Sequence, residues 1–136
     1  MPSFGTLKAD TLTHSTAGSL ATNFVVNGSA KAWVNFDGSG TIATRDSLNI
    51  SGLVDNGTGD YTISYSNSMS AAYSYSLTNY TAQSGSAQAF NNRINGASNK
   101  LAGSVRVNVG YVSSTVGNIT ADDASEINQT IQGDLA

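Results

Sequence analysis

Residues 31–75 read KAWVNFDGSGTIATRDSLNISGLVDNGTGDYTISYSNSMSAAYSY. Apolar and polar residues alternate in short runs through this block, and glycine-rich segments separate one run from the next. Alternation with a period of two is typical of strands that bury one face, and glycine supplies the backbone freedom that tight turns need. The block therefore predicts a succession of short antiparallel strands.

The first of these strands shows the alternation clearly. Ala32, Val34 and Phe36 share one face, and Trp33 lies on the other. Several short strands with turn signals about every eight to twelve residues indicate an all-β fold, and we expect an antiparallel β-sandwich or barrel. The block places its strands at residues 31–36, 41–45, 48–54, 60–66 and 72–77.

The sequence before the block predicts an extended N-terminal arm. Within it, residues 6–12 predict a short edge strand and residues 24–26 predict a second strand. The second is expected to end at the Asn-Gly pair that follows, which is a strong turn signal. We therefore divide the chain into an arm or attachment segment, residues 1–28, and a β-sandwich module, residues 29–136.

The sequence after the block contains one further clear strand, at residues 103–112, where valines alternate with polar residues. Residues 81–101 are rich in Ser, Gln and Asn and predict a long loop or an irregular strand. In the acidic tail, the spacing of Ile127 and Ile131 suits an amphipathic helix from about residue 122. A terminal strand and a frayed tail are the alternatives there.

The composition indicates a structural or binding role. Ser, Thr, Asn and Gly make up nearly half of the 136 residues, and charged residues only 11%, compared with about 25% in typical soluble domains. The net charge is −3 and the six Lys and Arg residues are scattered, so we expect no nucleic-acid partner. The N-terminal sequence has no apolar segment of the kind found in signal peptides or membrane spans, so we expect neither.

Residues capable of catalysis are few. His14 is the only histidine and the chain has no cysteine, so neither a catalytic triad nor a zinc site is expected. Asp37 and Asp55 each precede a turn glycine, where aspartate is favoured because its side chain accepts hydrogen bonds from the backbone. A carboxylate pair for glycan cleavage and a calcium loop at residues 55–60 are the alternatives. We expect no enzymatic activity, no cofactor and no metal.

Aromatic residues are the best candidates for a binding surface. Trp33 lies opposite the apolar face of its strand, and the chain has six tyrosines. Such residues can pack in the core, form a protein interface or stack on sugar rings. The interface hypothesis places at contacts between chains the residues Leu7, Leu12, Trp33, Tyr61, Tyr65, Tyr73 and Tyr75.

Three segments of the module resemble a known family. They read AWVNFDGSGT at residues 32–41, RDSLNIS at 45–51 and DNGTGDYT at 55–62. The combination is similar to a tail-fibre-like module that recurs in the virion proteins of tailed bacteriophages. The lead-in TLKADTL at residues 6–12 is similar to the short segment that often precedes such modules. The resemblance covers about half of the chain and implies an extracellular β module, commonly a trimer, without catalytic residues.

The expected function follows from this resemblance. It implies a non-enzymatic virion structural protein, a small tail fibre or tail appendage that assembles with other virion proteins as a homotrimer. Synthesis in the host cytoplasm and release by lysis would then explain an N-terminus without a signal peptide. A capsid decoration protein on the head is the first alternative. A glycan-binding or glycan-degrading spike module, with a host surface glycan as partner, is the alternative from another class.

Overall fold

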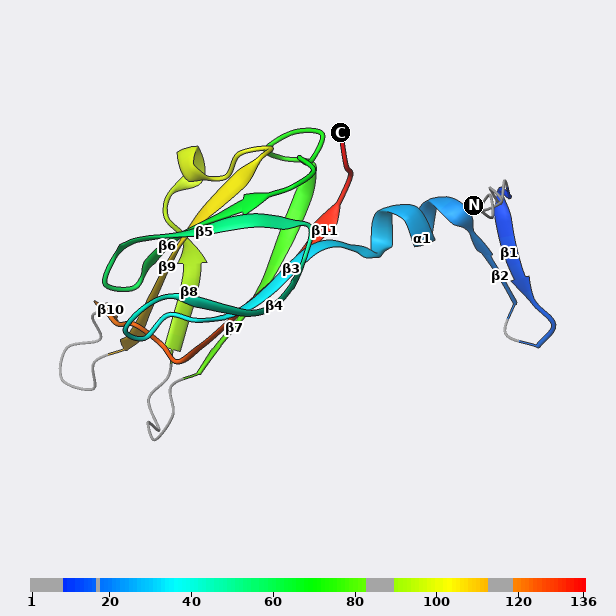
Figure 1. Ribbon diagram of the computed structural model, residues 1–136. Coiled ribbons are helices and arrows are strands. Elements are labelled where there is room, and N and C mark those ends of the chain that lie inside the picture. The colour runs from blue at the N-terminus through cyan, green and yellow to red at the C-terminus, as the bar shows by residue number, and fades with distance from the viewer. Residues whose placement is uncertain (1–8, 17, 83–89, 113–118) are drawn as a thin grey trace, which may run out of the picture.

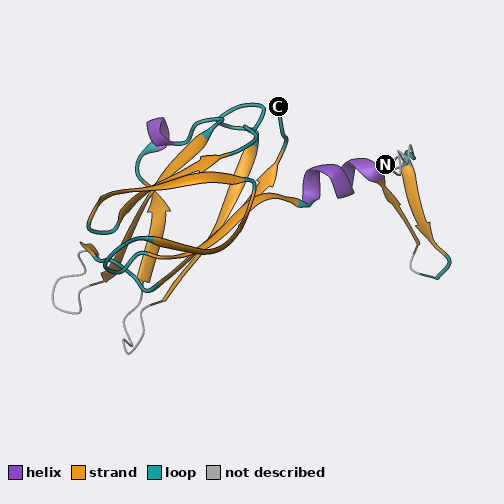
Figure 2. Ribbon diagram, viewed as in Figure 1, coloured by secondary structure: helices purple, strands orange, loops and turns teal. Residues whose placement is uncertain are grey.

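The computed structural model describes residues 9–16, 18–82, 90–112 and 119–136. Of these described residues, 63% lie in strands and 9% in helices, and Figure 2 shows strands throughout the main body of the molecule. The prediction of an all-β antiparallel fold is confirmed, and the fold is a sandwich, not a closed barrel.

The first sheet has four strands in the order β4-β3-β11-β7, and each neighbouring pair is antiparallel. The two central strands come from opposite ends of the module, so the sheet is complete only when the C-terminal strand has paired. Its members are β3 (Ala30–Asp37), β4 (Ala43–Leu48), β7 (Tyr75–Ala82) and β11 (Glu126–Gly133).

The second sheet is built around β9. Both β6 and β8 pair with Val107 and Asn108, so they lie on opposite edges of β9. Both β8 and β10 pair with Gly110 and Tyr111, so β10 lies on the same edge as β6. The members of this sheet are β5 (Ile50–Gly57), β6 (Asp60–Tyr65), β8 (Phe90–Ile94), β9 (Ser104–Val112) and β10 (Ile119–Ala121).

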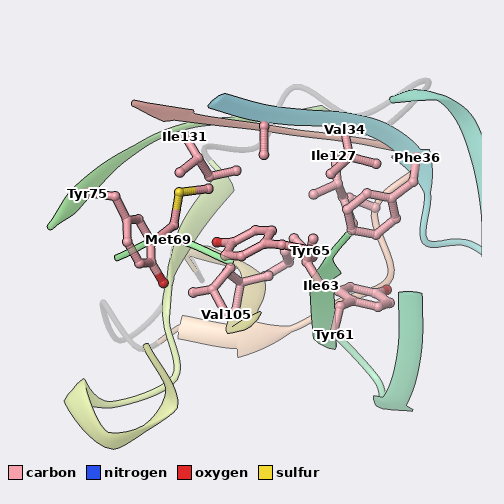
Figure 3. Packing of buried hydrophobic residues seen from close by; sticks show 14 residues of the cluster. Val34, Phe36, Tyr61, Ile63, Tyr65, Met69, Tyr75, Val105, Ile127 and Ile131 are labelled. Carbon is pink, nitrogen blue, oxygen red and sulfur yellow. The ribbon is translucent and has the colours of Figure 1, made fainter. Parts of the chain in front are cut away.

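The core lies between the two sheets and is formed by every second residue of their central strands (Figure 3). The rings of Phe36 and Tyr61 meet edge to face, with centroids 5.3 Å apart and an interplanar angle of 75°, a favoured aromatic geometry. The largest fully buried apolar side chains are those of Val34, Phe36, Tyr61, Ile63, Met69, Val105, Val107, Val109, Ile127 and Ile131.

The buried hydroxyl of Tyr61 connects three segments of the chain. The hydroxyl oxygen lies 3.1 Å from the carbonyl oxygen of Gly38 and 2.7 Å from Oδ1 of Asp123, and its one proton is donated to the nearer acceptor, Asp123. The same Asp123 oxygen accepts a hydrogen bond from the Gly59 amide at 2.7 Å. Burial, followed by the hydrogen bond to Asp123, raises the pKa of Tyr61 far above its usual range, so the phenol stays neutral and remains a donor.

Amide side chains join the two sheets on one lateral side. Asn79 on β7 donates to the carbonyl oxygen of Asn92 on β8 at 3.0 Å. Gln129 on β11, which is buried, donates from Nε2 to Oδ1 of Asn92 at 3.0 Å. Side chains therefore take the place of a strand ladder between β7 and β8.

Another side-chain amide, that of Asn49, joins the sheets on the other side, where the chain passes from β4 to β5. Asn49 has a positive φ of 57°, a conformation that asparagine tolerates better than most residues. Its Nδ2 donates at 3.0 Å both to the carbonyl oxygen of Lys31 on β3 and to that of Asn67, which follows β6. Its Oδ1 accepts from the Asn67 amide at 2.7 Å.

Two predicted elements differ in type. Residues 24–26 belong to helix α1 (Thr22–Gly28), not to a strand, and none of the described strands pairs with them. The predicted C-terminal helix is wrong, and the alternative of a terminal strand is correct, since β11 pairs with both β3 and β7. The spacing of four between Ile127 and Ile131 suits either element, because it is close to one helical turn and is also two periods of a strand.

The remaining strands predicted within the module have the right type with displaced boundaries, whereas part of the strand predicted at 6–12 lies outside the described residues. The predictions at 31–36, 60–66 and 103–112 match β3, β6 and β9 closely. The predictions at 41–45 and 72–77 begin two or three residues before β4 and β7. Within 81–101, expected to be a loop or an irregular strand, the described residues form β8 and a short 3-10 helix, Ala97–Asn99.

The N-terminal arm extends away from the sandwich (Figure 1). It consists of a hairpin, β1 (Thr11–His14) and β2 (Gly18–Ala21), followed by α1. The amide of Thr22 donates to the carbonyl oxygen of Asp10 at 2.9 Å, so the start of the helix is tied to the hairpin. At the other end, Nε2 of Gln132 on β11 donates to the carbonyl oxygen of Gly28 at 3.3 Å.

Candidate functional site

The outer face of the first sheet presents Trp33, as the alternation in β3 predicts. Ala32 and Val34 are buried, whereas Trp33 is only half-buried. Its register neighbours are Leu48 on β4 and Thr130 on β11. Together with Tyr80 on β7, which is exposed, Trp33 and Leu48 supply the apolar part of this outer surface. We call these three residues the Trp33 face.

A polar network borders the Trp33 face. Arg45 donates from Nη2 to Oδ2 of Asp37 at 3.0 Å and to the carbonyl oxygen of Ser125 at 2.6 Å. Asp37 Oδ1 accepts from the amide of Ser39 at 2.9 Å and from its hydroxyl at 2.6 Å. The hydrogen bonds from Ser39, with the nearby Arg45, hold the pKa of Asp37 below its ordinary value. Asp37 is therefore an ionised turn residue.

The carboxylates at residues 55–60 also have partners within the fold. Asp55 Oδ1 accepts from the Gly57 amide at 2.8 Å, which is the turn geometry expected from the sequence. Asp60 binds Arg106 through both oxygens, with Nε to Oδ1 at 2.8 Å and Nη2 to Oδ2 at 2.7 Å. These contacts favour the turn interpretation over the calcium loop. In the part of the chain that the structure describes, no three His, Asp or Glu side chains gather as metal ligands.

The Asp60–Arg106 pair predicts a pH-dependent stability. Arg106 lowers the pKa of Asp60 from its ordinary value of 3.8, so the pair stabilises the fold above this value and the contribution is lost as pH falls below it. We expect Asp60→Asn to be less stable than the parent at pH 7. As the pH falls below 3.8, the variant should lose less stability than the parent does. Urea unfolding at a series of pH values measures both effects.

Asp46→Asn is the matched control for this experiment. The Asp46 carboxylate accepts from the Ser47 amide at 2.8 Å and belongs to neither of the ion pairs formed by the described residues. If the free energy of unfolding fell as steeply with decreasing pH in Asp60→Asn as in the control, the stabilising role of the Asp60–Arg106 pair would be contradicted.

The interface hypothesis is wrong for Tyr61, Tyr65 and Tyr75. All three are buried between the sheets, because β6 and the start of β7 point them inward, where the hydroxyls of Tyr61 and Tyr75 reach acceptors. Two other candidates lie at the surface: Tyr73, with 84% of its area exposed, and Leu12, on β1. Leu7 lies outside the described residues.

The arm presents a larger apolar surface than the sequence predicted. Phe24 is 65% exposed and Val26 58% exposed, and no residue of α1 is buried. On the hairpin, Leu12 and Leu20 are register partners, and both are exposed. We define the arm patch as Leu12, Leu20, Phe24, Val25 and Val26. The run Phe24-Val25-Val26 was the available signal, but its interpretation as a strand of the arm, with one face buried, concealed the patch.

None of the helices in the described part of the chain has the length and hydropathy that a membrane-spanning helix requires. Comparison of the chain with protein-family models, with curated proteins and with solved structures finds no match.

Proposed function

We propose that this chain is a non-enzymatic structural protein of a tailed-bacteriophage virion, a small tail fibre or tail appendage that attaches through its N-terminal arm. The observation that carries the proposal is the arm patch, which is exposed in the part of the chain that the structure describes. The resemblance at residues 32–41, 45–51 and 55–62 supplies the class of assembly. A sandwich that stands apart from an apolar arm suits a displayed module with a separate attachment segment.

The arm patch favours a protein partner on energetic grounds. Complete burial of one Val, Leu or Phe side chain contributes about 1.5–3 kcal/mol, and the arm patch has five such side chains. Extensive exposed apolar surface typically marks an interaction site. The attachment partner we propose is another virion protein together with the arms of a homotrimer, whose contacts would desolvate few charges because only 11% of the residues are charged.

The glycan-degrading alternative has less support. Glycoside hydrolysis requires a carboxylic acid that stays protonated, with a raised pKa, beside a second carboxylate. The pKa values of Asp37 and Asp60 are both lowered, by the hydrogen bonds from Ser39 and from Arg106 respectively. These two residues are therefore suited to structural roles.

Immunogold labelling tests the proposal on particles released from cells whose phage or prophage encodes this chain. We expect label on the tails of particles carrying the parent chain. We expect the double variant Phe24→Ser, Val26→Ser to lose most of the label, because the arm patch loses its two most exposed side chains. In solution, light scattering should report a trimer for the parent and smaller species for the variant.

Val54→Ser is the control, since Val54 is an exposed apolar residue on the sandwich. It should retain both label and trimer, and circular dichroism should show strand content unchanged in all variants. Label on the heads would instead identify a capsid decoration protein. Particles without any label would contradict the proposal. Full labelling of particles that carry the arm variant would contradict the role of the arm.

A further inference from the structure

A pocket of about 160 Å³ opens on the outer face of the second sheet, where β8, β9 and β10 meet. It belongs neither to the Trp33 face nor to the arm. A volume of this size holds several water molecules, and therefore a group the size of one sugar residue. The residues that line it are Asn91, Arg93, Asn108, Val109, Ile119 and Ala121.

Strand register explains why these side chains meet. Arg93 on β8 is opposite Asn108 on β9, and Asn91 is opposite Gly110. Val107 and Val109 are buried, so Asn108 and Gly110, which alternate with them, belong to the outer face. Gly110 places no side chain there, and β10 approaches it closely: an added Cβ would lie 2.4 Å from the carbonyl oxygen of Thr120.

The polar groups of the pocket lack partners among the described residues. Oδ1 of Asn91 is buried and accepts no hydrogen bond. The side chains of Arg93 and Asn108 form no hydrogen bond or ion pair with any described residue. Arg106, close by on β9, is by contrast paired with Asp60. A buried acceptor without a donor costs about 1–3 kcal/mol, and such exceptions in a native fold call for an explanation.

The chemistry of the lining defines the ligand that would satisfy it. The guanidinium of Arg93, which pairs with no described residue, suits a carboxylate, which it can bind through two hydrogen bonds. The side-chain amide of Asn108, which has no partner among the described residues, can exchange hydrogen bonds with a hydroxyl group. Ile119 and Ala121 on β10 provide an apolar wall suited to the C–H face of a ring. A carboxylate, a hydroxyl group and an apolar ring face occur together in a uronic acid.

We propose that this pocket binds a carboxylate-bearing sugar residue of an acidic polysaccharide. The inference deepens the proposed function, since it names the class of host surface component that a displayed module would contact, and it rests on that function for its biological setting. A peptide carboxylate is the competing ligand. It is less well suited, because an aspartate or glutamate side chain offers no hydroxyl group to the side-chain amide of Asn108.

Isothermal titration and NMR of the purified full chain test the proposal with three probes: trigalacturonic acid, the neutral trisaccharide of galactose, and a short polyglutamate peptide. We expect trigalacturonic acid to bind and to shift the amide resonances of residues 91–93, 108–110 and 119–121. The neutral sugar should bind at least tenfold more weakly, because it has no carboxylate for Arg93.

Arg93→Gln should reduce the affinity for trigalacturonic acid about tenfold or more. Arg93 is exposed, so the substitution should leave the fold intact, which circular dichroism checks. Arg45→Gln on the opposite sheet removes the same charge and should leave the affinity unchanged. Asn108→Ala should weaken binding and leave the preference for the acidic over the neutral sugar in place.

Three results would overturn the proposal: no binding of trigalacturonic acid, equal binding of the neutral sugar, or equal or tighter binding of polyglutamate. The last would identify a protein docking site. These measurements use the isolated protein, so they are independent of whether immunogold labels a virion. Failure of either experiment is therefore distinguishable from failure of the other.

Discussion

Replacing Phe36 by alanine is expected to lower the free energy of unfolding by about 3–5 kcal/mol. Phe36 lies on β3, a central strand of the first sheet, and none of its side chain is exposed. Removing the ring would leave a cavity beside Tyr61 and abolish the edge-to-face contact at 5.3 Å. Urea unfolding measures the effect as a lower midpoint with an unchanged slope.

Leu48→Ala is the control for this variant. Leu48 lies on β4, the strand that pairs with β3, but 48% of its area is exposed. Its removal should cost less than about 1 kcal/mol, since only part of its transfer free energy is at stake. If both variants lost the same amount of stability, Phe36 would not be the centre of the core.

Gly59→Ala is expected to cost about 2–4 kcal/mol, considerably more than Gly40→Ala. Both glycines have a φ of 64°, so alanine meets the same backbone penalty of about 1–2 kcal/mol at either position. At Gly40 an added Cβ has no neighbour within 4 Å. At Gly59 it would lie 2.2 Å from the carbonyl oxygen of Val109 and 2.9 Å from the amide nitrogen of Asp122.

The difference between the two variants isolates the close packing of the turn before β6 against β9. The amide of Val109 donates to the carbonyl oxygen of Gly59 at 2.7 Å, and a methyl group at residue 59 would force these segments apart. Urea unfolding of the two variants side by side provides the measurement. Equal losses would mean that the turn moves aside at little cost.

Sequence patterns predicted the central strands because a period of two is unambiguous when the inward residues are large. Residues 31–36, 60–66 and 103–112 each have this property, and each forms a strand. Local preference misled at residues 24–26, where Phe-Val-Val has high strand propensity. A strand needs a neighbour, and the described residues of the arm offer none at that point.

The candidate sites were less accessible from sequence. Tyrosine carries both an aromatic ring and a hydroxyl group, so its presence on an alternating strand does not reveal whether its face is buried, as Tyr61 and Tyr65 show. The pocket at Asn91, Arg93 and Asn108 depends on the register between β8 and β9. No local pattern in the sequence encodes that register. Residue 93 was moreover predicted to lie in a loop or an irregular strand.

The side-chain amides of asparagine form hydrogen bonds that join the sheets on both sides, and this has a consequence for chemical ageing. Asparagine is among the thermolabile residues. Deamidation of Asn49 would replace the donor that reaches the carbonyl oxygens of Lys31 and Asn67 with a carboxylate, which only accepts hydrogen bonds. At Asn92 the amide that donates to Thr81 would be lost in the same way. Slow hydrolysis would therefore open this sandwich along its sides while the aromatic core was still intact.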